Sequence, residues 1–394
     1  MTKILKPQDL KDLVIGAPAL TTGGGGVAPP METVDKMVEE VIEKEGTCKL
    51  IDPKDIPDDA TIFYGCGAGG GIDLEMRQKW GGWGRDYLWE IAQKQKLFPL
   101  NSWSELPPLN SRDVTKKILK DLIEGRTPYA YLLFEVAPYI HRLCNAAIEG
   151  DLIIDADTTG YRSEPEMAIS TLNLYDVPIC PAVLATSYGD VVTYQKLLNW
   201  QRFEDLNRTI ANASGGGVGG LIAIEGKHVK KSVVPGSTTF IIDVGRAIRE
   251  AREKNDDPVE ALLEVTKGYK LFEGKIVSYL REERGGYWWG ESRFKGTGDF
   301  EGHSFRVWYK ECNQISWKDE EVFVTCPDPI DVVDRITGEG LSNITPEVWN
   351  TGREVTIIGR KSIDLWRTDK GLKIAGPTHF NYWMPYVPIE EIIK

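Results

Sequence analysis

The stretch from Asp155 to Glu166, here called the acidic motif, concentrates side chains that can do chemistry. It places four carboxylates, the guanidinium of Arg162 and the flexible Gly160 within twelve residues. The apolar run 152–154 precedes it and predicts the end of a buried strand. Acidic side chains cost several kcal/mol to bury without partners, so they need a metal, a substrate or an arginine here. We therefore interpret the motif as a functional site, since sites in α/β proteins form at strand ends.

The spacing inside the acidic motif is compatible with a metal site or with acid–base catalysis. Asp155 and Asp157 are two residues apart, so on a continuing strand both project from one face. Hard oxygen ligands suit Mg or Mn, and Zn when a histidine joins them, and we expect Asp155, Asp157, Glu166 and His303 as ligands. Without a metal, one carboxylate of raised pKa would activate water. The alternative is a solvated acidic loop that pairs with Arg162.

A glycine-rich run follows the β-prone segment 60–64. Gly65–Gly70 matches the G-x-G-x-x-G pattern of a dinucleotide-binding loop, which holds phosphate on backbone amides. The acidic residue expected about twenty positions later is only loosely matched by Asp86 or Glu90. Cys66 is a candidate nucleophile, because an amide-rich turn lowers a thiol pKa. The alternative for Cys66 is a small buried residue of the core.

Two further glycine clusters occupy residues 23–26 and 215–220. Such runs permit positive φ and close approach of a ligand to backbone amides, but they also serve as flexible linkers. The first cluster lies among apolar residues, which favours a ligand-contacting turn. We expect Gly24 and Gly25 of this turn, together with Gly67 of the middle run, to contact a substrate.

Four histidines and several aromatic pairs complete the set of candidates. His303 and His379 lie in turns of the C-terminal part, and we expect His379 to contact the substrate. The segment Tyr287–Trp289 could form one wall of a site for a planar ligand, or it could fill a domain interface.

The apolar pattern predicts an α/β domain followed by a smaller, mostly β domain. Helices are expected at 8–16, 31–45, 113–124, 138–149, 190–212, 240–253 and 257–266, and strands at 60–64, 129–136, 152–155, 179–186 and 221–225. This alternation favours a parallel or mixed sheet. After about residue 270 short β-prone runs appear at 275–280, 287–289, 304–309, 322–325, 355–358 and 362–367. We therefore expect domains at 1–270 and 271–394.

Composition narrows the classes of partner. The 394 residues carry 47 basic and 59 acidic side chains, a net charge of −12, which disfavours nucleic acid and anionic membranes. We expect no secretory signal, and no stretch approaches the roughly 18 apolar residues of a membrane span. The six cysteines are scattered without a C-x-x-C pair, which is typical of a reducing compartment. We expect a cytoplasmic protein that binds a small molecule, and a homo-oligomer.

Several segments in order resemble one family, the S-methyl thiohydantoin desulfurases, once a domain of unknown function associated with hydantoinase and oxoprolinase genes. The resemblance covers most of the chain. It is carried by Ala19–Gly26, by Asp155, Ala156, Asp157, Gly160, Arg162, Pro165 and Glu166, by Cys326–Ile330 with Thr337–Glu339, and by Gly376–Pro377 with Phe380, Tyr382 and Pro388. Glu135 falls where the family also tends to carry a glutamate.

The resemblance implies two domains, an α/β one and a β-rich one, and attack on a five-membered imide-like ring or its sulfur analogue. Three segments depart from the family pattern: the run 66–71, Ala137–Pro138, and Thr158–Tyr161. All three flank the expected pocket, so the chain resembles a divergent branch.

Together these patterns predict a hydrolase or lyase that acts on a small cyclic amide, a thiohydantoin-like compound or a related carbonyl substrate. Asp155, Asp157, Arg162, Glu166 and Cys66 are the expected catalytic residues. Substrate contacts are expected from Gly24, Gly25, Gly67, Glu135 and His379. Two alternatives stay open: a non-catalytic ligand-binding subunit of a hydantoinase-type complex, and a nucleotide-dependent enzyme that uses the run 65–70.

Overall fold

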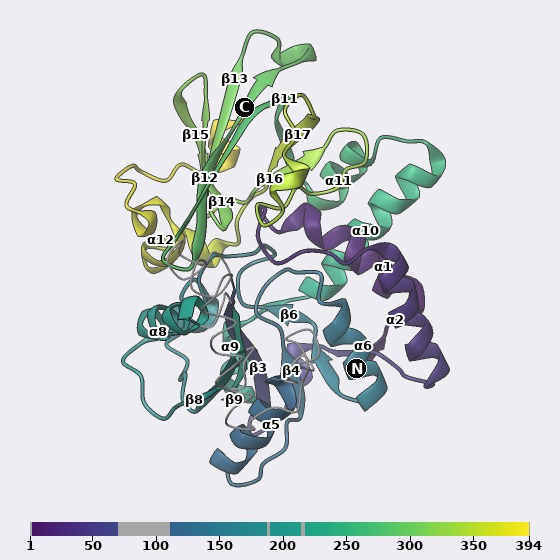
Figure 1. The fold of residues 1–394 in the computed structure, drawn as a ribbon, viewed down its shortest axis with the longest axis vertical. Helices are drawn as coiled ribbons and strands as arrows, with labels where there is room; N and C mark the ends of the chain where they lie inside the picture. The colour runs from purple at the N-terminus through teal and green to yellow at the C-terminus, as the bar shows by residue number, and fades with distance from the viewer. Residues whose placement is uncertain (1, 70–110, 187–189, 214–216, 394) are drawn as a thin grey trace, which may run out of the picture.

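The computed structural model describes residues 2–69, 111–186, 190–213 and 217–393. Two β-sheets organise these residues, and Figure 1 shows the second sheet above the first, with the C-terminal strands in green and yellow. The first belongs to an α/β domain and the second to a mostly β domain, as the sequence predicts.

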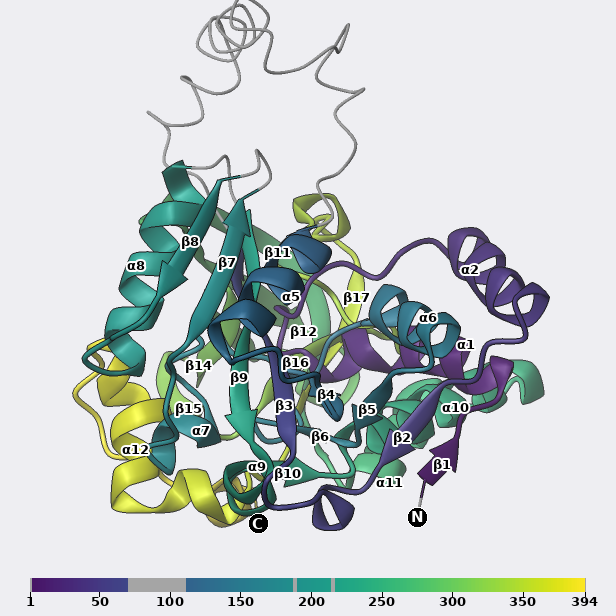
Figure 2. The ribbon, with the colours of Figure 1, turned by 90° about the horizontal axis from the view of Figure 1, so that it is seen from below.

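The first sheet is mixed and has eight strands in the order β1-β2-β5-β4-β3-β9-β7-β8. Figure 2 shows this order from β8 on one side to β1 on the other. Strands β2, β5, β4 and β3 run parallel, and the remaining neighbours are antiparallel. The strands are β1 (Thr2–Ile4), β2 (Lys49–Ile51), β3 (Thr61–Gly69), β4 (Ala130–Leu132), β5 (Leu152–Ile154), β7 (Ala182–Thr186), β8 (Val191–Tyr194) and β9 (Gly217–Glu225).

Both faces of the first sheet are apolar because its central strands alternate between two cores. Phe63, Tyr131 and Ile153 pack on one face, whereas Tyr64 and Ile154 pack on the other. The first face is covered by α1 (Pro7–Gly16), α2 (Met31–Glu43), α5 (Ser111–Leu122), α6 (Ile140–Glu149), α10 (Ser237–Lys254) and α11 (Pro258–Thr266). The second face is covered by α7 (Thr171–Leu174), α8 (Trp200–Ala213) and α9 (Gly226–Ser232).

The second sheet is antiparallel and has seven strands in the order β15-β14-β13-β12-β11-β17-β16. Its core contains Phe272, Phe294, Val332 and Ile357. The strands are β11 (Tyr269–Arg284), β12 (Tyr287–Gly296), β13 (Ser304–Lys310), β14 (Cys312–Lys318), β15 (Glu321–Thr325), β16 (Ile330–Asp334) and β17 (Glu354–Gly359). Two short strands, β6 (Ala156–Asp157) and β10 (Val234–Pro235), pair separately, and α12 (Asp369–Ala375) and α13 (Ile389–Ile392) follow the second sheet.

Three local expectations were wrong. Residues 191–194 form strand β8, so the helix expected from 190 begins at Trp200. Residues 364–367 form a 3-10 helix instead of a strand. Gly65–Gly69 lie inside β3 and pair with β9, so this part of the glycine run is not a turn. In the described part of the chain, no helix is long and apolar enough to cross a membrane.

Candidate functional site

A cavity of about 330 Å³ lies between the two domains. It opens beyond the carboxyl ends of the parallel strands β3 and β4, where ligands bind in α/β sheets. Both domains contribute to its lining: Gly25, Gly26, Gly67, Ala68, Gly69, Phe134, Glu135, Ala137, Tyr139, Glu164, Pro165, Met167, Arg208, Trp288, Glu311, Cys312 and Ile344. Of the expected site residues, Gly25, Gly67 and Glu135 are brought together here.

The glycine turn at 23–26 forms one side of this cavity. Gly25 has φ 72°, and a Cβ there would lie 2.5 Å from Oγ of Ser163. A Cβ at Gly24 would lie 2.3 Å from Sγ of Cys312, so Gly24 packs on the second domain. The carbonyl of Gly23 accepts a hydrogen bond from the amide of Asn343 at 2.8 Å. The turn is therefore fixed between the domains and is not a free linker, and its contact with a ligand stays a prediction.

The first two acids of the acidic motif hold the chain in place. Both oxygens of Asp155 accept hydrogen bonds from Thr239, at the start of α10. The carboxylate oxygens of Asp157 accept hydrogen bonds from the backbone amides of Thr159, Gly160 and Tyr161, with N–O distances of 2.8–2.9 Å. Burial raises the pKa of Asp157 to about 6, although these three hydrogen bonds oppose the rise. Neither residue borders the cavity.

Arg162 connects the acidic motif to the second domain. Its side chain is fully buried and donates to the carbonyl of Pro327 at 2.7 Å and to Oε1 of Gln314 at 3.0 Å. It also forms a buried ion pair with Glu164, with 3.0 Å between Nε and Oε1. Arg162 therefore neutralises and orients Glu164, which borders the cavity two residues later.

Glu166 and His379 contact each other, and neither residue lines the cavity. Glu166 pairs with Lys310 of β13, and Nε2 of His379 lies 3.3 Å from its second oxygen. Burial opposes ionisation of Glu166, but the hydrogen bond with His379 and the charge of Lys310 outweigh it and lower the pKa of Glu166. His379 therefore lies beside the acidic motif, and the roles of Glu166 and His379 in a reaction stay predictions.

Three carboxyl groups border the cavity, and burial raises the pKa of each. The pKa of Glu164 rises to about 7 although Arg162 opposes the change. The pKa of Glu311 rises to about 8 against the opposing charge of Arg208. Glu135 accepts the amide of Glu164 at 2.7 Å, and its pKa is raised well above the usual range by burial. Carboxyl groups of unequal and near-neutral pKa can exchange protons with a substrate at pH 7.

Glu311 reaches the cavity through an unusual backbone conformation. It is the single residue between β13 and β14, and its φ is 54°, which non-glycine residues rarely adopt. Its Oε1 accepts the amide of Trp288 at 3.1 Å. Nη1 of Arg208 lies 4.0 Å from the same oxygen and donates hydrogen bonds to the carbonyls of Gly69 and Gly286. The hydrogen bond to Gly286 connects the first domain to the second.

Cys66 borders a neighbouring cavity of about 470 Å³ and not the acidic one. Burial raises the pKa of its thiol, which disfavours the thiolate that a nucleophile needs. Cys312 does border the acidic cavity, but burial raises its pKa well above the usual range as well.

The four expected metal ligands do not share a site. Asp155, Asp157 and Glu166 have the separate partners given above, and His303 contacts Asp319 at 2.6 Å in exposed turns that flank β13 and β14. Across residues 2–69, 111–186, 190–213 and 217–393, no group of three or more His, Cys, Asp or Glu side chains is placed to hold a metal ion. The expectation that Asp155, Asp157, Glu166 and His303 together bind one metal ion is therefore wrong for this structure.

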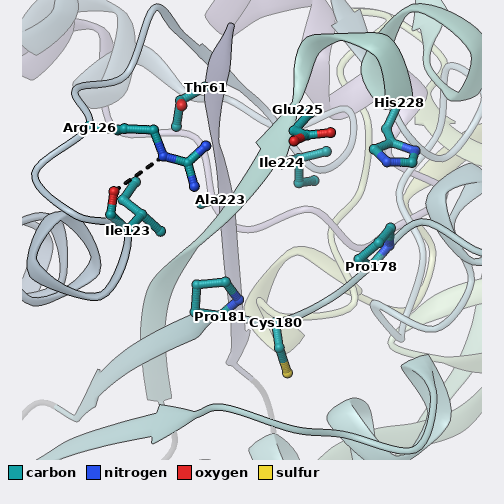
Figure 3. Close-up of a pocket in the computed structure, with 10 residues that line it drawn as sticks. All are labelled: Thr61, Ile123, Arg126, Pro178, Cys180, Pro181, Ala223, Ile224, Glu225 and His228. Carbon is teal, nitrogen blue, oxygen red and sulfur yellow. Dashed lines mark hydrogen bonds between the residues drawn. The ribbon is translucent and has the colours of Figure 1, made fainter. Parts of the chain in front are cut away.

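The nucleotide alternative finds little support in the described residues. Gly65–Gly69 is strand, and Gly70, Asp86 and Glu90 lie outside the described residues. Another cavity, of about 250 Å³, lies where β3 begins and β9 ends (Figure 3). It contains Arg126, whose Nε donates to the carbonyl of Ile123, but no residue expected from the sequence as part of the site.

Sequence reasoning missed Glu164 as a cavity residue, together with Arg208, Glu311 and Cys312. It noted Trp288 as a possible wall of a planar site, which is its position here. The only sequence signal for Glu311 is a polar run, 310–314, inside a β-rich region, and such a run is more typical of an exposed edge.

Comparisons with known proteins agree with this architecture. Residues 8–81 match the family model described as S-Me-THD-like, N-terminal domain, and residues 199–389 match S-Me-THD-like, C-terminal domain. A crystal structure of a protein from Chromobacterium violaceum shares 18% identity and a TM-score of 0.67, over 98% of this chain and 100% of that one. No curated protein matched the sequence. The two family models together cover most of the chain, which belongs to the S-Me-THD-like, or S-methyl thiohydantoin desulfurase-like, family.

Proposed function

We propose that this protein is a desulfurase-type hydrolase that acts on a small cyclic amide or thiohydantoin-like compound in the cavity between its domains. The observation that carries the proposal is the set of three carboxyl groups around one cavity, of which Glu164 and Glu311 are buried and Glu135 is half-buried. Membership of the S-Me-THD-like family supports the class of substrate.

The chemistry would be a hydrolysis of a carbon–sulfur bond. A water oxygen attacks the ring carbon that carries the S-methyl group, the carbon–sulfur bond breaks, and a carbonyl forms. One hydrogen of the water goes to the leaving methanethiol and the other to the ring nitrogen, so no oxidant or reductant is needed. The protein has to remove a proton from water and supply one to the leaving group.

The environments of the carboxyl groups support an assignment of these roles. Glu164 lies beside Arg162 and has the lower pKa, about 7, so it acts as the base. Glu311, with a pKa of about 8, keeps its proton at neutral pH and acts as the acid. Glu135 also keeps its proton and can donate a hydrogen bond to a ring carbonyl. Trp288 can pack against the planar ring.

The test measures methanethiol release from S-methyl thiohydantoin by the wild type, Glu164→Gln and a matched control, Glu347→Gln, on an exposed residue that does not line the cavity. We expect Glu164→Gln to lower kcat by roughly 10²–10⁴-fold and the control to match the wild type. Each protein is assayed with and without a chelator, because release that the chelator abolishes would assign a metal to the reaction.

Two results would contradict the proposal. Full turnover by Glu164→Gln would remove Glu164 from the reaction. A rise in Tm with the substrate but no product would favour the alternative of a non-catalytic binding subunit.

A further inference from the structure

The apolar cavity beside the site has no part in the chemistry proposed above. It measures about 470 Å³ and shares Gly67, Ala68, Gly69, Phe134 and Tyr139 with the acidic cavity. Its other lining residues are Gly65, Cys66, Leu132, Leu133, Arg142, Gly217, Val218 and Leu221. The two cavities therefore adjoin along the carboxyl end of β3.

Glycines in β3 and β9 keep this second cavity open. Among the described residues, a Cβ at Gly65 would have the carbonyl of Leu132 as its nearest neighbour, at 3.8 Å, and a Cβ at Gly217 would meet nothing within 4 Å. Neither glycine has positive φ. By contrast, a Cβ at Gly67 would lie 2.4 Å from the carbonyl of Val218, so pairing of the strands requires that glycine. Gly65 and Gly217 are not needed for packing or conformation, and glycine inside a strand often marks close approach of a ligand.

The two cavities also differ in chemistry. The three carboxyl groups of the site border only the acidic cavity, whereas the second is lined mainly by Leu, Val, Phe and glycine. The thiol of Cys66 stays neutral because burial raises its pKa. The guanidinium of Arg142 packs over the ring of Tyr131 at 3.9 Å. A ligand that spans both cavities would therefore place a polar ring in one and an apolar group in the other.

We propose that the apolar cavity binds a hydrocarbon substituent of the substrate, so that the preferred substrate is a cyclic amide or thiohydantoin ring with an aliphatic or aromatic side group. This inference rests on the proposed function for the position of the ring. Burial of the side group in a lining without charged carboxylates provides the favourable free energy.

The experiment compares kcat/KM for S-methyl thiohydantoin without a ring substituent and with a benzyl group at carbon 5. Variants Gly65→Val and Gly217→Val place a side chain in the cavity from two neighbouring strands, and valine suits a strand. Thr61→Val introduces the same residue at the far end of β3 and serves as the control. We expect the wild type to prefer the benzyl compound by at least about tenfold, and both glycine variants to lose that preference while they keep turnover of the unsubstituted ring.

A binding measurement separates this inference from the proposed function. Affinities of hydantoin and 5-benzylhydantoin are measured by calorimetry on the same proteins. If nothing is turned over but Gly65→Val selectively weakens binding of the benzyl compound, the cavity assignment holds and the proposed reaction fails. If the wild type binds or converts both compounds equally, or if Gly65→Val affects both equally, the cavity assignment is overturned.

Discussion

Two parts of the cavity wall present a carboxyl group by opposite means. In the acidic motif, Glu164 is held by a network in which Asp157 binds three amides and Arg162 reaches the second domain. At the end of the β13–β14 hairpin, Glu311 itself has the left-handed backbone conformation, and its carboxyl group accepts a hydrogen bond from the amide of Trp288. The position of Glu164 depends on side-chain interactions in the loop, whereas the position of Glu311 depends mainly on its own backbone conformation. Replacing each glutamate with glutamine should therefore have different effects.

The largest expected effects concern catalysis. With Glu164 as base and Glu311 as acid, kcat/KM should rise through about pH 7 and fall through about pH 8. Glu164→Gln should remove the acidic limb and Glu311→Gln the alkaline limb, each with a rate loss of roughly 10²–10⁴-fold. Rate profiles from pH 5 to 10 test this, and an unchanged limb in either variant would contradict the corresponding role.

The next largest effect concerns stability and tests the network around Glu164. Arg162→Met should leave Glu164 buried without its counter-charge and remove the contact with Pro327, and we expect a loss of about 3–5 kcal/mol in the free energy of unfolding. Urea unfolding measures it, with Arg202→Met, on an exposed helical surface, as the control. A loss no larger than that of the control would show that the network is not needed.

A smaller effect is expected at Asp157, where two interpretations differ. In Asp157→Asn, the new side-chain NH₂ group would point at a backbone N–H that now donates a hydrogen bond to the carboxylate. Two donors would then face each other, and we expect a loss of about 1–3 kcal/mol in the free energy of unfolding. If Asp157 is instead catalytic, as the sequence suggests, the variant should lose turnover at unchanged stability. Thermal unfolding measured beside turnover decides between the two.

The last expected effect is a pH dependence of stability at the hairpin, which accumulates over several pH units. The pKa of Glu311 is about 8 when folded and near the usual 4.5 when unfolded, so the folded state retains a proton that the unfolded state releases. Wild-type stability should therefore fall as pH rises from about 4.5 to 8, by at most about 1.4 kcal/mol per pH unit. Glu311→Gln should lack this contribution, which denaturant unfolding at pH 5.5 and 8.0 would reveal. If the free energy of unfolding changed with pH by the same amount in both proteins, Glu311 would not be the source of the pH dependence.

The contrast also explains what the sequence could predict. The order of helices and strands follows from local apolar patterns, such as the alternation of Phe63 and Tyr64 between two cores. The acidic motif is visible because its acids are close in sequence. Spacing could not show that Glu164 borders the cavity while Glu166 pairs with Lys310, because that partner is 144 residues away.

The hairpin was not predictable for a related reason. Asn313 and Gln314 are buried in β14, where they bind the carbonyl of Ile330 and the guanidinium of Arg162. These polar residues break the apolar pattern that identifies a strand, because Gln314 binds an arginine of the first domain and Asn313 binds a main-chain carbonyl of its own domain. A polar strand of this kind is recognised only when its partner is known.

The buried arginines between the domains have a consequence for how the cavity is completed during synthesis. Arg162 binds Pro327, Arg208 binds Gly286, and Arg360 donates to carbonyls of Leu20 and Tyr161. A ribosome releases the first domain before the hairpin that carries Glu311, and domains generally fold in that order. Until the second domain is made and docks, the growing chain lacks one wall of the cavity and one of its acids, so it carries only half of a site.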